Sequence, residues 1–181
     1  MSLSRRKEIL EIASKYNIFI LEDNPYDKLR FEGEPLPSIQ SFDHEGRVIN
    51  LGTFSKILCP GLRLAWISGN KNIIEKIVIL KQATDLCTPI FNQMIAYEYC
   101  SKGYIDKNID SNISIYREKR DVMLESLEKH FPEGAVWTQP EGGFFVFVTL
   151  PETIDADKML YEAIEEKVAY VSGSSFYANG K

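Results

Sequence analysis

Two short stretches of the sequence place reactive side chains directly after an apolar run. The first holds Asp23 and Tyr26, which follow the apolar run at residues 18–21. A run that is apolar at every position is typical of a strand buried on both faces of a parallel sheet. Ligands of such sheets bind beyond the carboxyl ends of the strands. The sequence therefore places a carboxylate and a phenol where a ligand would be bound.

The second stretch is the run Thr53-Phe54-Ser55-Lys56, which follows a predicted strand at residues 47–52 and leads to Arg63 through a Pro-Gly turn. The amine of a lysine attacks carbonyl groups when desolvation or nearby cations lower its pKa. An arginine offers a charged, bidentate donor to phosphate. Taken singly, each residue has an ordinary explanation: a loop acid, a solvated amine, a turn or a surface ion pair. Only their combination is informative.

The surrounding pattern supplies the elements that would position these side chains. Helical periodicity predicts helices at residues 4–16, 71–82, 90–102, 105–130 and 155–167. Apolar runs predict strands at residues 18–21, 47–52, 62–68, 135–138, 143–150 and 168–171. Residues 24–46 are predicted to form a long loop with one helical turn. The first hundred residues thus indicate a parallel-sheet α/β unit and the remainder a separate α+β unit, with a boundary near Gly103.

The bulk composition argues against several functional classes. The 181 residues are 44% hydrophobic and 26% charged, as in ordinary globular proteins. The net charge is −5 and the basic residues are scattered, which disfavours a nucleic-acid partner for this segment. The apolar stretches have the length of strands, so no membrane span is expected. Cys59, Cys87 and Cys100 form no C-x-x-C pair and indicate free thiols in the cytoplasm. His44 and His130 have no partner at metal-ligand spacing, so no metal site is predicted.

Together, the two stretches resemble the fold-type I pyridoxal-phosphate aminotransferases of class I and II. The matching segments are residues 21–26 (LEDNPY), 52–66 (GTFSKILCPGLRLAW), 116–120 and 140–148 (PEGGFFVFV). The resemblance implies an α/β fold, with part of the large parallel-sheet domain at residues 1–103 and most of the smaller α+β C-terminal domain at residues 104–181. It also implies pyridoxal 5′-phosphate as cofactor, amino-acid and 2-oxo-acid substrates, and a homodimer.

The resemblance also implies a role for each residue of the two stretches. Lys56 would hold the cofactor as a Schiff base and move the proton of the substrate α-carbon. Asp23 would keep the pyridine nitrogen protonated, which makes the ring an electron sink, and Tyr26 would donate to the 3′ oxygen. Arg63 would bind the phosphate, with Thr53 and Ser55 as further donors. Gly143 and Phe144 would line the substrate. Phe145 and Phe147 are interpreted as core residues of the smaller domain instead, and Trp66 and Tyr116 as packing residues.

Several features of the family are not found in these residues. They are the Gly-Ser/Thr phosphate loop, the aromatic residue that stacks on the ring, the Asn at the 3′ oxygen and the Arg that binds the substrate carboxylate. The chain therefore resembles an interior piece of an aminotransferase. We expect it to bind cofactor weakly and to turn over no substrate alone. We also expect self-association to cover the apolar face and strand edges of its shortened sheet.

Three functions stay open at this point. Transamination is favoured, and residues 31–39 (FEGEPLPSI) resemble the subgroup that acts on 2-aminoadipate, kynurenine, valine or aromatic substrates. Some bacterial transcription regulators carry an aminotransferase-like effector domain with similar TFSK and PGLR runs, and a DNA-binding domain in the parent gene would identify them. A pyridoxal-phosphate-dependent C–S lyase shares the fold type and would differ in its products.

Overall fold

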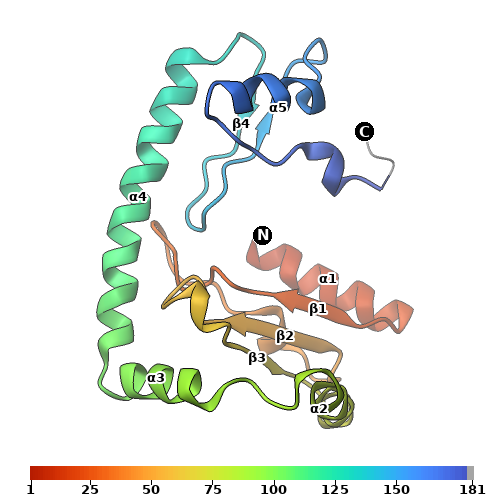
Figure 1. Cartoon of the computed structure of the whole chain (residues 1–181). Coiled ribbons are helices and arrows are strands. Elements are labelled where there is room, and N and C mark those ends of the chain that lie inside the picture. The colour runs from red at the N-terminus through yellow and green to blue at the C-terminus, as the bar shows by residue number, and fades with distance from the viewer. Residues whose placement is uncertain (179–181) are drawn as a thin grey trace. The chain divides into compact units, whose positions relative to one another are not determined.

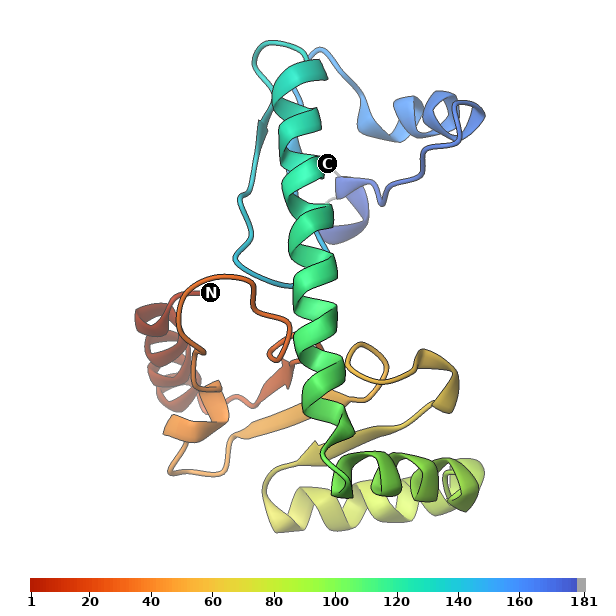
Figure 2. The ribbon, with the colours of Figure 1, turned by 90° about the vertical axis from the view of Figure 1, so that its left-hand side faces the viewer.

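The fold is known from a computed structural model, which describes residues 1–178. The chain divides into two compact units. The first consists of Met1–Arg120 and Glu141–Phe144, and the second of Asp121–Pro140 and Phe145–Lys181. The division falls inside α4 (Tyr104–His130), which Figure 2 shows as one continuous helix. The boundary near Gly103 concerns the domains of the complete family fold, and it stays a prediction.

The first unit is built from a three-stranded sheet and its helices (Figure 1). Its elements are α1 (Leu3–Tyr16), β1 (Ile20–Asp23), η1 (Ile39–Phe42), β2 (Val48–Thr53), η2 (Pro60–Leu62), β3 (Ala65–Ser68), α2 (Lys71–Asp85), α3 (Ile90–Ser101) and the first part of α4. Every predicted helix of this unit is present, and the predicted turn within residues 24–46 is η1.

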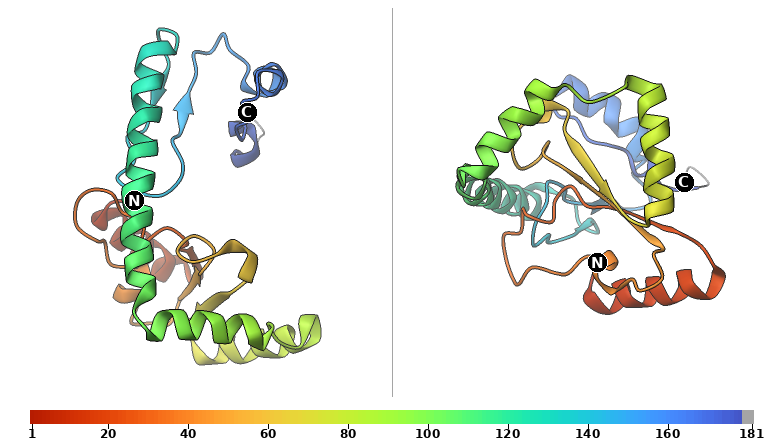
Figure 3. Two further views of the ribbon diagram at one scale, coloured as in Figure 1. Left: turned by 60° about the vertical axis from the view of Figure 1, so that its left-hand side comes forward. Right: turned by 90° about the horizontal axis from the view of Figure 1, so that it is seen from below.

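The strands of this sheet are ordered β1-β2-β3 and lie side by side next to α1 (Figure 3). The parallel arrangement predicted from the sequence is correct for β1 and β2, in which Asp23 lies opposite Leu51. It is wrong for β3, which runs antiparallel to β2 and pairs Thr53 with Ala65. The reason lies in the connection at residues 54–64, because a parallel crossover needs a dozen or more residues and usually a helix.

The second unit contains a two-stranded antiparallel sheet and one helix. Its elements are β4 (Val136–Trp137), β5 (Val148–Thr149), α5 (Ala156–Glu165) and η3 (Gly173–Phe176), together with the end of α4. Asp155 caps α5 as predicted and accepts hydrogen bonds from the backbone N–H groups of Asp157 (3.0 Å) and Lys158 (3.2 Å). The strand predicted at residues 143–150 is reduced to β5, and the one predicted at 168–171 is absent from the described part of the chain.

The buried side chains are concentrated in the first unit. There the buried hydrophobic residues are Ala13, Leu29, Phe31, Ile39, Val48, Ile57, Leu64 and Ala96. Within the described part of the second unit, only Leu127 and Ser172 are buried. The two units therefore differ strongly in how much of a core each one contains.

Apolar side chains also lie on the surface of the first unit. On β1, Leu21 is 64% exposed, and at the end of α2 Leu86 is 77% exposed. A groove of about 720 Å³ runs along β3, α2 and α3 and includes Leu86 in its lining. The self-association expected from the sequence would cover such surface, and it stays a prediction. No helix within residues 1–178 is long and apolar enough to cross a membrane.

Candidate active site

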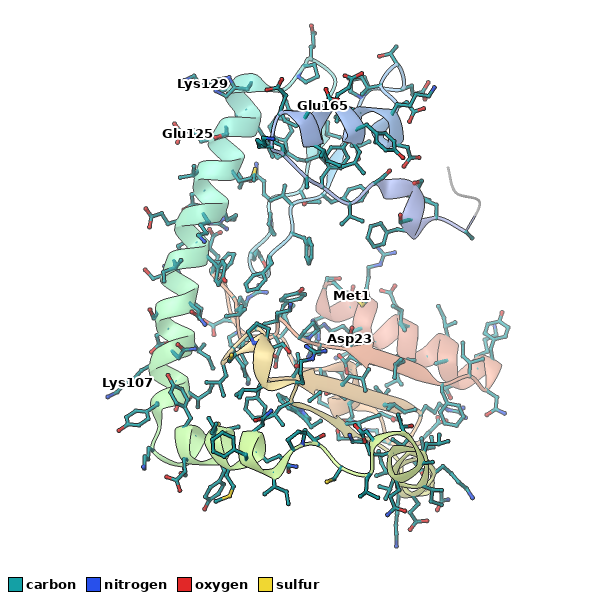
Figure 4. All side chains as sticks on the ribbon, viewed as in Figure 1. Met1, Asp23, Lys107, Glu125, Lys129 and Glu165 are labelled. Atoms are coloured by element: carbon teal, nitrogen blue, oxygen red, sulfur yellow. The ribbon has the colours of Figure 1, made fainter. Side chains whose placement is uncertain are left out.

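The first predicted site residues stand at the carboxyl end of β1. Asp23 is the last residue of this strand and is exposed (Figure 4). The backbone N–H of Asn24 donates to the carbonyl of Leu51 (3.0 Å), which continues the parallel pairing with β2 by one residue. Because parallel strands end at the same edge of a sheet, Asp23 lies beside the segment that leaves β2 towards Lys56.

The segment after β2 is closed on itself by hydrogen bonds. The backbone N–H of Phe54 donates to the carbonyl of Leu64 (3.1 Å), and so does the hydroxyl of Thr53 (2.9 Å). The same hydroxyl oxygen accepts from the backbone N–H of Ser55 (3.0 Å) and lies 3.0 Å from the Ser55 hydroxyl. The proton of Thr53 is thus used within the protein, so the hydroxyl of Ser55 is the better placed of the two to donate to a phosphate.

Lys56 is half-buried and is followed by the buried residue Ile57. The carbonyl of Ile57 accepts a hydrogen bond from the side-chain amide of Asn108 on α4 (2.7 Å). Asn92 on α3 donates in the same way to the carbonyl of Leu62 (3.0 Å). Both asparagines were missed by sequence reasoning, since a polar residue within a helix carries no sign of which loop it holds.

Arg63 has the left-handed backbone conformation, with φ 54° and ψ 41°. Its side chain is exposed, and one guanidinium nitrogen donates to the carbonyl of Pro60 (3.3 Å). A guanidinium has five N–H donors, so others are available to an anion. A left-handed conformation costs a residue with a side chain about 1–2 kcal/mol, and such strain is concentrated at functional sites.

Tyr26 is half-buried at the start of the loop that follows β1. Burial, and then the negative charge of Asp23, raise the pKa of its phenol above the ordinary value. The phenol is therefore kept protonated and able to donate a hydrogen bond. Its ring lies 5.2 Å from that of Phe144, which in turn lies 4.2 Å from the ring of Tyr116. Tyr116 thus packs against Phe144, and its assignment as a packing residue rather than a ligand contact stays a prediction.

The segment that carries Gly143 and Phe144 is held close to this loop. The backbone N–H of Gly143 donates to the carbonyl of Leu29 (2.9 Å), and Gly143 has a positive φ of 82°. A Cβ at Gly142 would lie 2.5 Å from the same carbonyl oxygen, so only glycine permits this approach. The structure therefore brings Tyr26 and Phe144 together from distant parts of the sequence.

The chemistry of these side chains fits pyridoxal phosphate. Asp23 offers a carboxylate for the pyridine nitrogen, Tyr26 a phenol for the 3′ oxygen and Lys56 an amine for the aldehyde. Arg63 and Ser55 offer donors to a phosphate. The large groove along β3 is a separate feature, because none of the predicted site residues lines it. Among residues 1–178 no cluster of three or more His, Cys, Asp or Glu side chains could hold a metal ion.

Comparison with known proteins identifies the family. The family model for aminotransferase class I and II matches residues 1–181. The chain belongs to this family. It is 52% identical over 179 residues to aromatic-amino-acid aminotransferase 1 of Thermococcus litoralis, a match that covers 99% of the chain and 43% of that relative. It is 34% identical to the HTH-type transcriptional regulator YisV of Bacillus subtilis over 93% of the chain and 35% of the regulator.

Solved structures of aminotransferases share the fold. Kynurenine aminotransferase of Pyrococcus horikoshii matches with a TM-score of 0.95 and 51% identity, over all of the chain and 45% of that structure. The α-aminoadipate aminotransferase LysN of Thermus thermophilus matches with a TM-score of 0.92 and 37% identity, over 99% of the chain and 47% of LysN. The α/β fold of a class I and II aminotransferase is thereby confirmed, and the chain spans less than half the length of these relatives.

Proposed function

We propose that the whole protein transfers an amino group between an L-amino acid and a 2-oxo acid, with pyridoxal phosphate bound at Lys56. One observation carries this proposal: the parallel strands β1 and β2 end at one edge, where Asp23 is the last residue of β1 and the segment of Lys56 follows β2. When bound, the cofactor supplies an electron sink that stabilises negative charge at the substrate α-carbon.

The residues of the chain then divide the remaining work. The amine of Lys56 removes the proton from the substrate α-carbon and later donates it again to complete the amino-group transfer. The negative charge of Asp23 favours a proton on the ring nitrogen. The phenol of Tyr26 donates a hydrogen bond to the ring oxygen, and Arg63 binds the phosphate. Gly143 and Phe144 form the wall against which the substrate side chain packs.

The substrate is proposed from the similar proteins. The relative from Thermococcus litoralis is named for aromatic amino acids, and the neighbour from Pyrococcus horikoshii was solved with kynurenine. We propose an aromatic amino acid as the amino donor. We also propose that the whole protein is a homodimer in the cytoplasm. A panel of aromatic, aliphatic and acidic amino donors tests the choice, and a donor preference for short aliphatic amino acids would contradict it.

The decisive experiment labels Lys56. Borohydride reduction of the whole protein with pyridoxal phosphate is expected to attach one cofactor to the peptide that contains Lys56, as seen by mass spectrometry. Lys56→Arg keeps the charge but not the nucleophile, so it should prevent labelling and lower kcat/KM about 100- to 10,000-fold. Labelling at another lysine, or equal turnover by Lys56→Arg, would overturn the proposal. The 181-residue chain alone is expected to be labelled only weakly.

A second function has support from the comparisons. The regulator YisV is similar over most of this chain, so the same residues are compatible with the effector domain of a transcription regulator. Cofactor labelling at Lys56 would occur in both cases. Sequence-specific DNA binding by the whole protein, together with absent turnover, would favour the regulator over the enzyme.

A further inference from the structure

Glu22 is a buried carboxylate for which the proposed reaction has no role. It is the one charged residue that is buried within residues 1–178, and its side chain is 8% exposed. Successive side chains of a strand point to opposite faces of the sheet. The carboxylates of Glu22 and Asp23 therefore leave β1 on opposite sides, one into the protein and the other to the exposed edge.

The carboxylate of Glu22 is surrounded by donors. Oε1 accepts from the backbone N–H of Ile39 (2.8 Å), and Oε2 accepts from the backbone N–H of Gln40 (3.1 Å) and from the side-chain amide of Asn50 (3.1 Å). The guanidinium of Arg6 lies 3.7 Å from Oε1. A carboxylate is the acceptor-only group that satisfies all of these donors together. Its burial is therefore compensated.

These bonds close the loop that carries Tyr26. The loop at residues 24–38 begins directly after Asp23 and ends directly before Ile39, whose backbone N–H donates to Glu22. Both ends of the loop thus meet at β1. In between, Leu29 is fully buried and its N–H donates to the carbonyl of Tyr26 (2.9 Å). Surface loops closed in this way are compact and frequently functional.

The residues that close the loop also contact β2 and β3, the strands on either side of the Lys56 segment. Glu22 lies opposite Asn50 on β2, and Asn50 lies opposite Ser68 on β3. The side-chain amide of Gln40 donates to the carbonyls of Val48 (3.2 Å) and Ser68 (3.0 Å). The loop end is thus fastened to all three strands of the sheet.

We propose that Glu22 is a positioning residue, which holds the phenol of Tyr26 at the candidate site by closing the loop at residues 24–38. Loop closure stands on the structure alone, whereas its effect on the cofactor rests on the proposed function. Glu22→Gln removes the negative charge and places an amide NH₂ donor against the N–H groups that donate to Glu22. Glu22→Asp keeps the charge but is one methylene too short to reach the same amides, so its effect should be smaller.

The first test needs no cofactor. In the chain with ¹³C-labelled tyrosine, the Tyr26 signal is assigned by its loss in Tyr26→Phe. Glu22→Gln is expected to bring the titration midpoint of Tyr26 down towards that of an exposed tyrosine. It should also speed amide exchange at Ile39 and Gln40 about 10-fold or more. Glu11→Gln, an exposed glutamate of α1, is the matched control and should change neither measurement. An unchanged Tyr26 titration in both Glu22 variants would overturn the proposal.

The second test asks whether Glu22 acts through Tyr26. In the whole protein with bound pyridoxal phosphate, Glu22→Gln should move the pH midpoint of the visible absorption in the same direction as Tyr26→Phe, by a smaller amount. Combined with Tyr26→Phe, it should add no further movement. If Glu22→Gln shifted the pH midpoint of the absorption equally with and without Tyr26→Phe, the proposal would be overturned. A whole protein without cofactor absorption would refute the proposed function, while the tyrosine titration would still decide on the loop.

Discussion

Single residues set the space available around the Lys56 segment. At Gly52 on β2, a Cβ would lie 2.2 Å from Cε2 of Trp66, which stands opposite on β3. The Trp66 ring packs edge-on against Phe54 (5.1 Å between centroids), as expected for a packing residue. Phe54 directly follows β2, two residues before Lys56. The absent side chain of Gly52 therefore makes room for the aromatic pair beside the lysine.

Gly52→Ala should consequently be a costly substitution. We expect the Trp66 ring to be displaced, with a loss of about 1–3 kcal/mol in the free energy of unfolding, because overpacking forces side chains from their rotamers. Chemical denaturation measures the loss, and the fluorescence of Trp66 should shift to longer wavelength in the folded state.

Two further variants make this prediction specific. At Gly61 a Cβ would meet only the sulfur of Cys59 at 3.8 Å, so Gly61→Ala should leave the free energy of unfolding nearly unchanged. Trp66→Leu should restore most of the stability that Gly52→Ala removes. Equal stability of Gly52→Ala and Gly61→Ala would contradict the argument.

At this scale the sequence revealed residue types but not their surroundings. Asp23, Tyr26 and Lys56 follow apolar runs, so their place at the strand ends was predictable. Glu22 stands in the same motif, yet its role depends on hydrogen bonds from Ile39 and Asn50. Partners so distant in the sequence cannot be predicted from the local residue pattern. The left-handed conformation of Arg63 was equally hidden, since arginine has no preference for it.

Among the elements, helices were predicted better than strands. The repeat of apolar positions located α1, α2, α3, α4 and α5, because apolar residues recur every three to four positions in an amphipathic helix. Strand direction has no such signal, and β3 was wrongly taken as parallel. The strand expected at residues 143–150 is reduced to β5, because Gly143 at its start has a φ of 82°, outside the β region. Phe145 and Phe147, which were expected in a core, are exposed.

The carboxylate of Asp43 binds the backbone of the segment that leads into β2. Asp43 accepts hydrogen bonds from the backbone N–H of Val48 (2.7 Å) and of Glu45 (2.9 Å). Burial acts to raise the pKa of Asp43, but backbone hydrogen bonds, that of Val48 first, lower it more, so the pKa lies below its ordinary value. Between its folded and unfolded pKa the unfolded chain binds more protons, so folding loses stability as the pH falls.

Asp43→Asn should therefore change how stability depends on pH. At neutral pH the variant is expected to be less stable than the natural chain. The difference should shrink as the pH falls from the ordinary aspartate pKa of about 4 through the lower pKa of folded Asp43. Urea denaturation at pH 7, 5, 4 and 3 measures it. Asp110→Asn, an exposed carboxylate of α4, should give no such convergence, and a difference that is constant with pH would contradict the role of Asp43.

For the whole molecule, the two units differ in their buried cores. The described part of the second unit buries only Leu127 and Ser172, whereas eight hydrophobic side chains are buried in the first. Hydrophobic burial is the main favourable contribution to folding. The second unit of this chain should therefore be the less stable of the two.

The two tryptophans allow this to be measured, because Trp66 belongs to the first unit and Trp137 to the second. In the variant Trp66→Phe the remaining fluorescence reports on the second unit, and in Trp137→Phe on the first. We expect the Trp137 signal to change at a lower urea concentration than the Trp66 signal. Coincident transitions would show that the chain unfolds as one cooperative body.

The closed segment around Lys56 has a consequence for the order of events on the ribosome. Its closing partners, Phe54 and Leu64, emerge close together, whereas the ring that packs against Tyr26 belongs to Phe144. Leu64 and Phe144 are 80 residues apart (144 − 64), which ribosomes translate in about 4–16 s at ~5–20 residues per second. The segment around Lys56 in the nascent chain can therefore close several seconds before Phe144, whose ring packs against Tyr26, has been synthesised.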